Sequence, residues 1–547
     1  MVACLTLVCN PLCLYSVPYR SCLAVGIYQM YAAVDASCRG GWQVVGVSYG
    51  VVLEGIVATV VRVEADVSQG LPQFSIVGLP DSAVSESRLR IRAAIRNSGL
   101  PFPNSRITIN LSPASLKKRG AGLDLAIAIA ILNATGAIPE TNLMGCGFSA
   151  ELGLSGQLVP VPGIMNLALS LHSRGLNRFF IAADELEHCL PIPGFTWIAL
   201  PTLAEVAKWL TSPKPKRMVQ PVWPNPQAID ETTDISVDMA DVEGLETVKR
   251  GLLIAACGKH HTLLIGPPGC GKTMLAERFA TILPHLSSEE ALEVYALYQA
   301  CGTPRPLTIR PPLRAPHHSL TTAGLIGGGA PPMPGEATLA HQGVLVLDEL
   351  LEFGRQTLDS LREPLTTRQI RITRSSHTSV FPASFILIGT LNPCLCGQLG
   401  SGTCTCLPTE VRRYWSRVSG PFFDRMELVI TISKRELSGI HKYAPHQLAR
   451  NKAETSEDMR EKVTSGRRAL DERLKGLKGI QSDVHRTTSA LLESTERRLS
   501  LSRRAAASAL SVARTISVLE GADTVLPEHL AEALAMRISR PWDMSTP

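Results

Sequence analysis

Two kinds of apolar segment alternate between residues 52 and 210, and they differ in length and in residue type. The runs at 57–63 and 107–110 are short, apolar and rich in β-branched residues, which predicts strands. The stretches at 123–132 and 165–173 are longer and rich in Ala and Leu, which predicts helices. Strands that alternate with helices are typical of an α/β or α+β domain.

The same pattern divides the rest of the chain. Residues 1–51 form an apolar extension that we leave unassigned, ahead of the domain at 52–210. A Pro- and Lys-rich linker at 211–234 cannot hold a helix or a sheet, so it predicts a domain boundary. Residues 235–432 carry the phosphate-binding motifs of an α/β core. Residues 433–547 are charged and rich in Arg, Glu, Ala and Leu, which predicts helices.

Composition narrows the class of protein. At 547 residues the chain is too long for one core, which agrees with several domains. No apolar run is long enough to span a membrane, so no membrane contact is expected. The first basic residue is Arg20, so the positive start of a secretory signal is missing and we expect a cytoplasmic protein. A net charge of +6 allows a polyanionic partner without arguing for one.

The strongest chemical signal is a phosphate-binding loop of the pattern GxxxxGK(S/T), which consists of Gly266, Pro267, Pro268, Gly269, Cys270, Gly271, Lys272 and Thr273. An apolar strand at 262–265 precedes it and a helix at 274–283 follows it. Glycines let backbone N–H groups converge on phosphate oxygens at a helix N-terminus. We expect Lys272 to reach the β- and γ-phosphates of ATP and Thr273 to bind Mg²⁺.

Two further apolar strands end in polar residues. The strand at 343–347 leads to Asp348, which would enter the Mg²⁺ shell, and to Glu349, which would orient or deprotonate the attacking water. The strand at 385–391 leads to Asn392, which would polarise the water or the γ-phosphate. Each is ambiguous alone, since acidic pairs often cap helices and Asn is common in turns. In this order after a P-loop, they are typical of an AAA+ module.

Four cysteines form two CxC pairs separated by seven residues: Cys394, Cys396, Cys404 and Cys406. Four thiolates on one loop can surround Zn²⁺ tetrahedrally. Redox-active or free thiols are the alternative.

The segment at 368–381 alternates in the manner of a β-hairpin. Its cations are Arg368, Arg371 and Arg374. They could contact nucleic-acid phosphates in a pore or simply face solvent.

Longer motifs make the chain resemble a known family from about residue 52 to residue 540. The motifs are GLPQFSIVGLP at 70–80, RAPHH at 314–318, GGG at 327–329, PGEATLAHQGV at 334–344, NPC at 392–394 and SGPFFDR at 419–425. They resemble the magnesium-chelatase-like AAA+ proteins of the YifB/ComM type.

This resemblance implies a homo-oligomeric ring, expected to be hexameric, with ATP between subunits. By similarity Arg425 matches an arginine finger that acts in trans, and Arg504 matches the sensor-2 arginine of a C-terminal helical lid. ComM-type members are implicated in branch migration of DNA, so single-stranded or branched DNA is the expected partner and a branch-migration helicase in DNA uptake or recombination the expected function. A magnesium-chelatase-type motor subunit and a protein-remodelling ATPase are the alternatives.

The N-terminal domain resembles the Lon protease fold, which raises the possibility of an ATP-dependent protease. Gly122 occupies the position of the catalytic serine in that pattern, and Met165 occupies the position of the partner lysine. Neither residue can supply a nucleophile or a base. The resemblance therefore implies a non-proteolytic domain.

Overall fold

The computed structural model describes residues 45–213, 218–222, 237–432 and 454–538, apart from 115, 117, 119, 304, 330–331, 375–376, 400–402, 477–482 and 500. The expected extension up to residue 44 and most of the expected linker lie outside the described residues. In the described ranges no helix is both long and apolar enough to cross a membrane.

The first half of the chain builds a seven-stranded mixed sheet of order β3-β4-β2-β1-β5-β8-β9. Its strands are β1 (Gly46–Glu54), β2 (Val57–Ser68), β3 (Gln73–Val77), β4 (Arg106–Ser112), β5 (Cys146–Phe148), β8 (Arg178–Ala182) and β9 (Thr196–Leu200). Its helices are α2 (Ser82–Asn97), α3 (Asp124–Ala134), α4 (Glu140–Leu143), α5 (Ile164–Ser173) and α6 (Leu203–Thr211), and a small ribbon joins β6 (Glu151–Leu152) to β7 (Leu158–Val159). The strands and helices expected in this half are confirmed.

Helix α3 is the centre of this half, because it is apolar on all sides and is covered on all sides. Its residues from Asp124 to Asn133 are all buried, and it packs against β1 and β2. A Cβ atom at Gly46 would lie 2.2 Å from the carbonyl oxygen of Ala130, so glycine lets β1 lie directly on the helix. Since β1 starts at Gly46, the sheet begins before residue 52, where the hydrophobic pattern placed the boundary.

The second half builds a five-stranded parallel sheet of order β11-β12-β15-β10-β16. Its strands are β11 (Leu313–Arg314), β12 (Val344–Leu347), β15 (Ile386–Leu391), β10 (Thr262–Ile265) and β16 (Leu428–Thr431). The strands expected beside the three phosphate motifs are confirmed as β10, β12 and β15, to within one residue at each end.

Helices surround this second sheet. They are α8 (Glu246–Gly258), α9 (Lys272–Phe279), α10 (Ser288–Ala300), α11 (Thr322–Ile326), α12 (Glu336–Leu339), α13 (Arg355–Ser360), α14 (Pro364–Thr367), α15 (Pro408–Trp415) and α16 (Gly420–Phe423). Helix α9 begins two residues before the expected 274–283 and ends earlier, because residues 280–282 tighten into a short 3-10 turn.

The last described segment is helical, as expected. It consists of α18 (Ser456–Gly476), α19 (Arg486–Leu499), α20 (Arg503–Leu519) and α21 (Pro527–Ile538). Helix α18 packs closely on α8, where a Cβ atom at Gly466 would lie 2.7 Å from the sulfur of Cys257. Helix α20 also packs on α8, and α21 packs on β16. The helices therefore cover one side of the five-stranded sheet.

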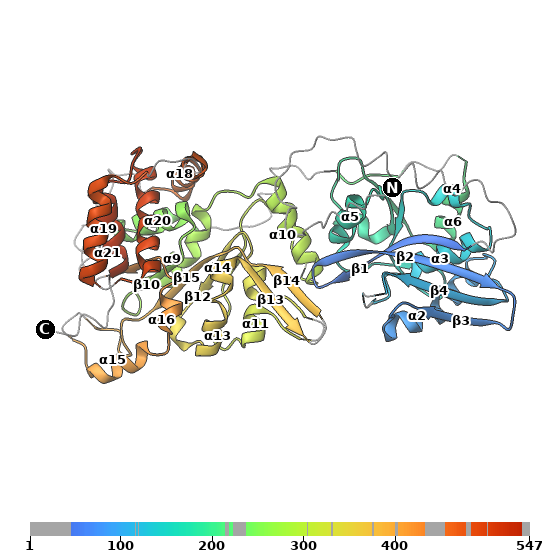
Figure 1. Cartoon of the computed structure of the whole chain (residues 1–547), viewed down its shortest axis with the longest axis horizontal. Coiled ribbons are helices and arrows are strands. Elements are labelled where there is room, and N and C mark those ends of the chain that lie inside the picture. The colour runs from blue at the N-terminus through green and yellow to red at the C-terminus, as the bar shows by residue number, and fades with distance from the viewer. Residues whose placement is uncertain are drawn as a thin grey trace, which may run out of the picture.

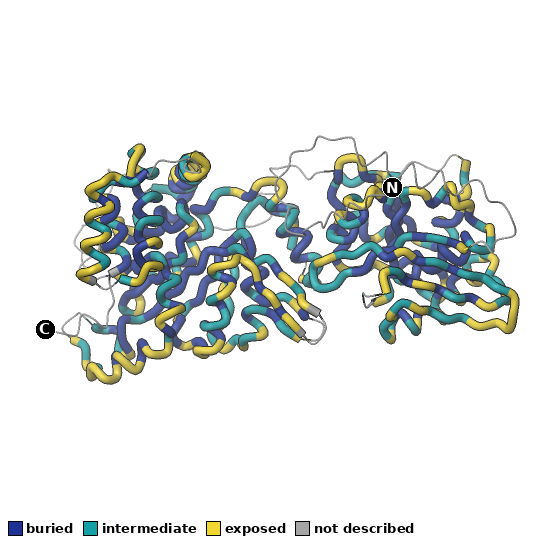
Figure 2. The backbone as a smooth tube through the Cα atoms, viewed as in Figure 1, coloured by how far each residue is buried: buried dark blue, intermediate teal, exposed yellow. Residues whose placement is uncertain are grey.

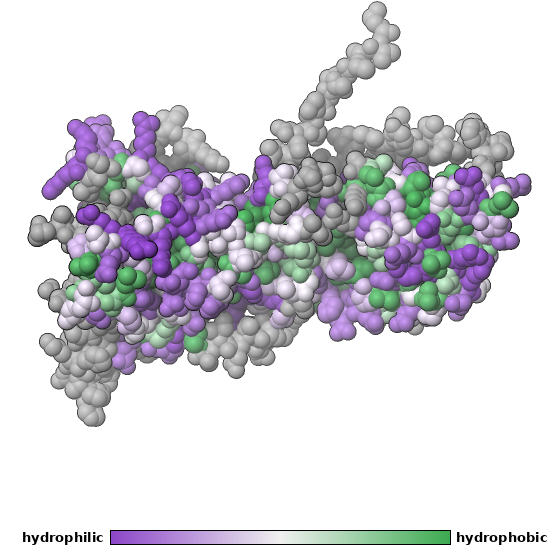
Figure 3. Space-filling view, turned by 90° about the horizontal axis from the view of Figure 1, so that it is seen from below, coloured by the Kyte–Doolittle hydropathy of each residue, from purple (hydrophilic) through white to green (hydrophobic). Residues whose placement is uncertain are grey.

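The two sheets lie side by side along the long axis of the molecule, and α10 lies between them (Figure 1). The central strands of the second sheet are buried, whereas β2 and β3 of the first sheet and the outer helices carry many intermediate and exposed positions (Figure 2). Seen from below, hydrophilic residues predominate over the half that holds the C-terminal helices (Figure 3). Tyr295 of α10 shares one hydrophobic cluster with Met165 and Leu167 of α5, so apolar packing joins the halves.

The expected hairpin is present as β13 (Gln369–Arg374) and β14 (His377–Pro382), with residues 375–376 of its turn outside the described part. Ile370 and Ile372 are buried on one face, and Arg371 is exposed on the other. Arg368 does not belong to the hairpin strands. It ends α14 with a positive φ of 57°, so its backbone is not extended.

An ion pair joins α2 to α3, in which the carboxylate is buried and the arginine side chain is 24% exposed. Arg90 Nε lies 3.0 Å from Asp124 Oδ2, and burial raises the pKa of Asp124. Arg90→Met leaves this carboxyl group without its ion pair, so we expect the free energy of unfolding of this half to fall by about 3 kcal/mol. Thermal unfolding followed by circular dichroism measures the loss. Arg92→Met, an exposed position on the same helix, is the control, and equal stability of the two variants would contradict the prediction.

Candidate functional site

The P-loop connects β10 to α9 at the edge of the sheet where the parallel strands end, which we call the carboxyl edge. Strand β10 ends at Ile265 and α9 begins at Lys272, so the loop leads straight into a helix N-terminus. Gly269 and Gly271 have φ angles of 75° and 84°, a region that favours glycine. The loop can therefore direct backbone N–H groups and the helix dipole at a phosphate group.

The ammonium group of Lys272 is held at the centre of this edge. Its Nζ atom donates to the carbonyl oxygens of Gly266 and Pro267, each at 2.9 Å, and to Asn392 Oδ1 at 3.1 Å. Lys272 and Asn392 are far apart in sequence. They meet because β10 and β15 are neighbouring parallel strands and both residues follow the ends of these strands.

Thr273 and Asp348 also meet at the carboxyl edge. Thr273 Oγ1 donates to Asp348 Oδ2 at 2.9 Å, and Thr390 Oγ1 donates to the other carboxylate oxygen. A hydroxyl and a carboxylate are oxygen ligands that suit Mg²⁺. The sequence interpretation missed Thr390, although a hydroxyl residue two positions before Asn392 in an otherwise apolar strand is a usable signal.

Glu349 follows Asp348 with a positive φ of 50°, which is uncommon for a residue other than glycine. Its backbone N–H donates to Thr390 Oγ1 at 3.1 Å, and its side chain is 61% exposed, so a water molecule can reach the carboxylate. His318 Nδ1 lies 3.8 Å from Glu349 Oε2, and the His318 ring lies against the ring of His317. His318 belongs to the RAPHH motif but was not predicted to be a site residue.

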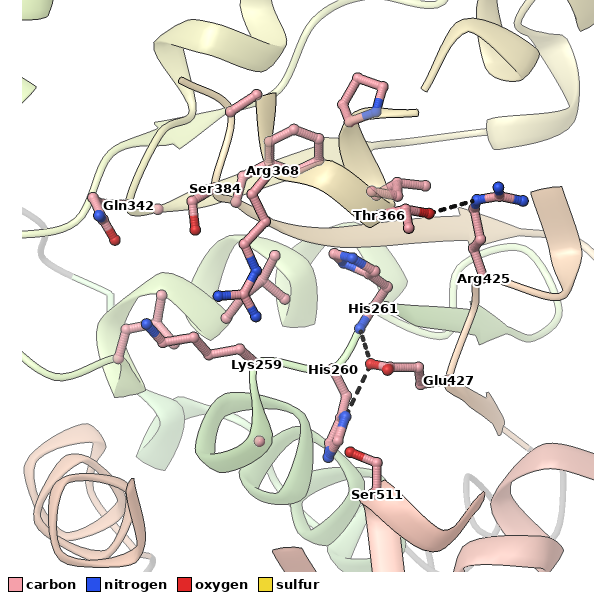
Figure 4. A pocket seen from close by; sticks show the side chains of 18 of the residues that line it. Lys259, His260, His261, Gln342, Thr366, Arg368, Ser384, Arg425, Glu427 and Ser511 are labelled. Carbon is pink, nitrogen blue, oxygen red and sulfur yellow. Dashed lines mark hydrogen bonds and ion pairs between the residues drawn. The ribbon is translucent and has the colours of Figure 1, made fainter. Parts of the chain in front are cut away.

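The opposite edge of the same sheet, where the strands begin, holds a cavity of about 430 Å³. We call this edge the amino edge and the cavity the basic pocket. Figure 4 shows side chains that line it. Its cations come from separate elements of the chain and are Lys259, Arg368, Arg425, Arg467 and Arg504.

Hydrogen bonds join Glu427 to two neighbouring histidine residues in the wall of the basic pocket. Glu427 Oε2 lies 2.9 Å from His260 Nδ1 and accepts the backbone N–H of His261 at 3.2 Å (Figure 4). Burial works to raise the pKa of Glu427, but the hydrogen bond and charge of His260 outweigh it and hold the pKa below its usual value. This network joins the start of β10 to the start of β16.

The cations of the basic pocket are crowded. Burial, followed by the charges of Arg504 and Arg362, lowers the pKa of Arg425. Burial lowers the pKa of Arg467 to about 10, and burial together with the charge of Arg467 lowers the pKa of Lys259. The carboxylates that line the pocket, Glu290, Asp424 and Glu427, are fewer than its five Lys and Arg side chains, so the pocket is suited to an anion such as a phosphate group.

Arg425 and Lys272 lie at opposite ends of the strands. Arg425 Nε donates to Thr366 Oγ1 at 3.2 Å in the pocket, and Arg425 precedes β16, whereas Lys272 follows β10. The four residues of β10 span about 13 Å. A γ-phosphate bound beside Lys272 is therefore out of reach of Arg425 in the same chain.

The four cysteines lie together directly after Asn392. The Sγ atom of Cys394 lies 3.3 Å from that of Cys396 and 3.7 Å from that of Cys404, and all four sulfurs lie within 4.8 Å of one another. Tetrahedral Zn–S bonds of about 2.3 Å would place sulfurs about 3.8 Å apart. The donor set therefore fits Zn²⁺.

In the first half, the positions that resemble a protease site hold no such chemistry. A Cβ atom at Gly122 would lie 3.4 Å from Ser149 Oγ, and Met165 is fully buried with its sulfur accepting the backbone N–H of Leu190. Neither position offers a nucleophile or a proton acceptor for catalysis.

Three family descriptions match separate parts of the chain. "Subunit ChlI of Mg-chelatase" matches residues 63–185, "Magnesium chelatase, subunit ChlI" matches 238–440, and "Magnesium chelatase, subunit ChlI C-terminal" matches 453–537.

Two similar curated proteins cover most of the chain, and a third covers less than a third of it. Protein YifB of Salmonella typhimurium is 39% identical over 499 residues, which cover 88% of this chain and 95% of YifB. Competence protein ComM of Haemophilus influenzae is 36% identical over 493 residues, with 88% and 95% covered. The Magnesium-chelatase 67 kDa subunit of Chlorobaculum parvum is 26% identical over 164 residues, 29% of this chain and 23% of that subunit. The chain therefore belongs to the YifB and ComM family of magnesium-chelatase-like AAA+ proteins.

Proposed function

We propose that the protein is an ATP-hydrolysing AAA+ ring motor that acts on DNA as a branch-migration helicase in DNA uptake or recombination. The observation that carries the ATPase part is the assembly of the P-loop with Asp348 and Asn392 at one sheet edge. These groups come from three neighbouring strands and match what phosphoryl transfer requires: a phosphate cradle, a metal site and a water-activating carboxylate beside them.

Each residue has a role in hydrolysis. Lys272 exchanges its carbonyl partners for the β- and γ-phosphates of ATP. Thr273 and Asp348 would hold Mg²⁺, which neutralises phosphate charge. Glu349 orients and deprotonates the water, and Asn392 contacts the γ-phosphate.

Arg425 and Arg504 complete the site of a neighbouring subunit. Both line the basic pocket, at the sheet edge remote from the P-loop, so they are available to meet an ATP molecule bound by another copy of the chain. A guanidinium group stabilises charge on the transferred phosphoryl group. A closed ring, expected to have six subunits, supplies every site with these arginines.

The other parts of the chain support the motor. The domain expected at 52–210, with its start moved to β1, is a non-proteolytic Lon-like domain, and the helices within 433–547 form the lid over the AAA+ core at 235–432. The four cysteines hold a structural Zn²⁺ ion. The fit of their sulfur positions supports this assignment.

The hairpin β13–β14 is the DNA-contacting element. Arg371 is exposed on the face opposite its buried isoleucines, and Arg374 follows three residues later. Similarity to a protein named for competence supports DNA as the partner. Similarity to a magnesium-chelatase subunit supports the second candidate, a chelatase-type motor.

Glu349→Gln tests the assignment of the base. The amide keeps the shape of the side chain but cannot accept a proton, so we expect ATP to bind while hydrolysis falls by roughly 10²–10⁴-fold. Lys272→Ala is the matched control that loses nucleotide binding. Steady-state phosphate release and nucleotide titration measure the two effects, and normal turnover by the Glu349 variant would show that another group is the base.

DNA-dependent ATPase activity tests the motor. We expect single-stranded, duplex and four-way-branched DNA to raise the hydrolysis rate, the branched form most. Arg371→Ala should lower the DNA-stimulated rate more than the DNA-free rate, because it removes a phosphate contact. Arg412→Ala, at an exposed position off the hairpin, is the control. If the protein hydrolyses ATP at a rate that none of these forms of DNA alters, a chelatase-type or protein-remodelling motor would be favoured instead.

A further inference from the structure

The four-cysteine loop touches the P-loop through one glycine. A Cβ atom at Gly397 would lie 2.4 Å from Pro268 Cδ and 2.8 Å from Pro268 Cγ. The Cα atom of Gly397 therefore rests directly against the proline ring. Gly397 also has a φ of 72°, so its own backbone conformation favours glycine.

The turn that carries Gly397 is anchored to the core of the second half. The backbone N–H of Gly397 donates to the carbonyl oxygen of Cys394 at 2.9 Å, and Cys394 is fully buried. The indole N–H of Trp415 donates to the carbonyl oxygen of Pro393 at 3.1 Å. The start of the loop is therefore fixed by packing and by hydrogen bonds.

The same loop begins at the phosphate site. Its first residue follows Asn392 and Pro393 in the chain, and Asn392 accepts the hydrogen bond from Lys272. The loop thus meets the phosphate site twice, through Asn392 at its start and through Pro268 at its turn.

We propose that the four-cysteine loop, when closed by Zn²⁺, is a positioning element for the P-loop, so that zinc occupancy sets the affinity for nucleotide. The inference rests on the proposed ATP site and the proposed zinc site. A metal ion that ties the first CxC pair to the second fixes the turn that carries Gly397. Without the metal, the turn keeps its anchor at Cys394 but loses its tie to the second CxC pair, so its contact with Pro268 is held less firmly.

Gly397→Ala separates the contact from the metal. All four cysteines remain, so zinc content should stay at the wild-type value, while the new Cβ atom pushes on Pro268 and weakens nucleotide binding by about tenfold. Titration with a fluorescent ADP analogue measures affinity, and metal analysis measures zinc. Gly302→Ala is the control, because Gly302 has a similar φ of 66° and no atom within 4 Å of the added Cβ.

Removal of the metal tests the same coupling without relying on one variant. Wild-type protein treated with a zinc-selective chelator in excess Mg²⁺, and the Cys404→Ser variant, should both lose zinc and bind nucleotide more weakly. Any one of three results would overturn the proposal. They are an unchanged nucleotide affinity of the Gly397→Ala variant with its zinc retained, an unchanged nucleotide affinity of zinc-free protein, and wild-type protein that contains no zinc. Zinc-loaded wild-type protein that binds no nucleotide would instead overturn the proposed ATP site.

Discussion

The parallel pairing of β10 with β15 on one side and β16 on the other organises the whole second half of the molecule. Because the strands share one direction, the residues that follow them meet at the carboxyl edge, and those that precede them meet at the amino edge. Lys272 and Asn392 gather at the first edge. Arg425 and Glu427 gather at the second. The strands keep the two groups apart, so Arg425 cannot reach a phosphate group beside Lys272 in the same chain.

Each edge is held by its own set of polar contacts. At the carboxyl edge, Thr390 links the Asp348 carboxylate to the backbone of Glu349, which couples the positions of these two residues. At the amino edge, Glu427 is bonded to His260 and to the backbone of His261, and three carboxylates face five Lys and Arg side chains in the pocket. The crowded cations would gain from an incoming anion.

Local patterns predict much of this arrangement. The P-loop and the strands of the other two phosphate motifs are predictable because each is a short contiguous run with a distinctive end. Thr390 offers a weaker signal, a single hydroxyl residue in an otherwise apolar strand, and hydroxyl residues are common in strands. Alternation assigns Arg368 to the hairpin, yet its positive φ ends a helix and its side chain lines the basic pocket. The contact of Gly397 with Pro268 joins two loops distant in sequence, and no local pattern reports such packing.

The most direct test of the central claim mixes two inactive chains, Lys272→Ala and Arg425→Ala. If the site is shared between subunits, the mixture regains ATPase activity, because an intact P-loop of one chain meets an intact Arg425 of the other. Random association of equal amounts should restore about a quarter of the wild-type rate. A mixture as inactive as its two components, although the chains co-assemble, would contradict the shared site.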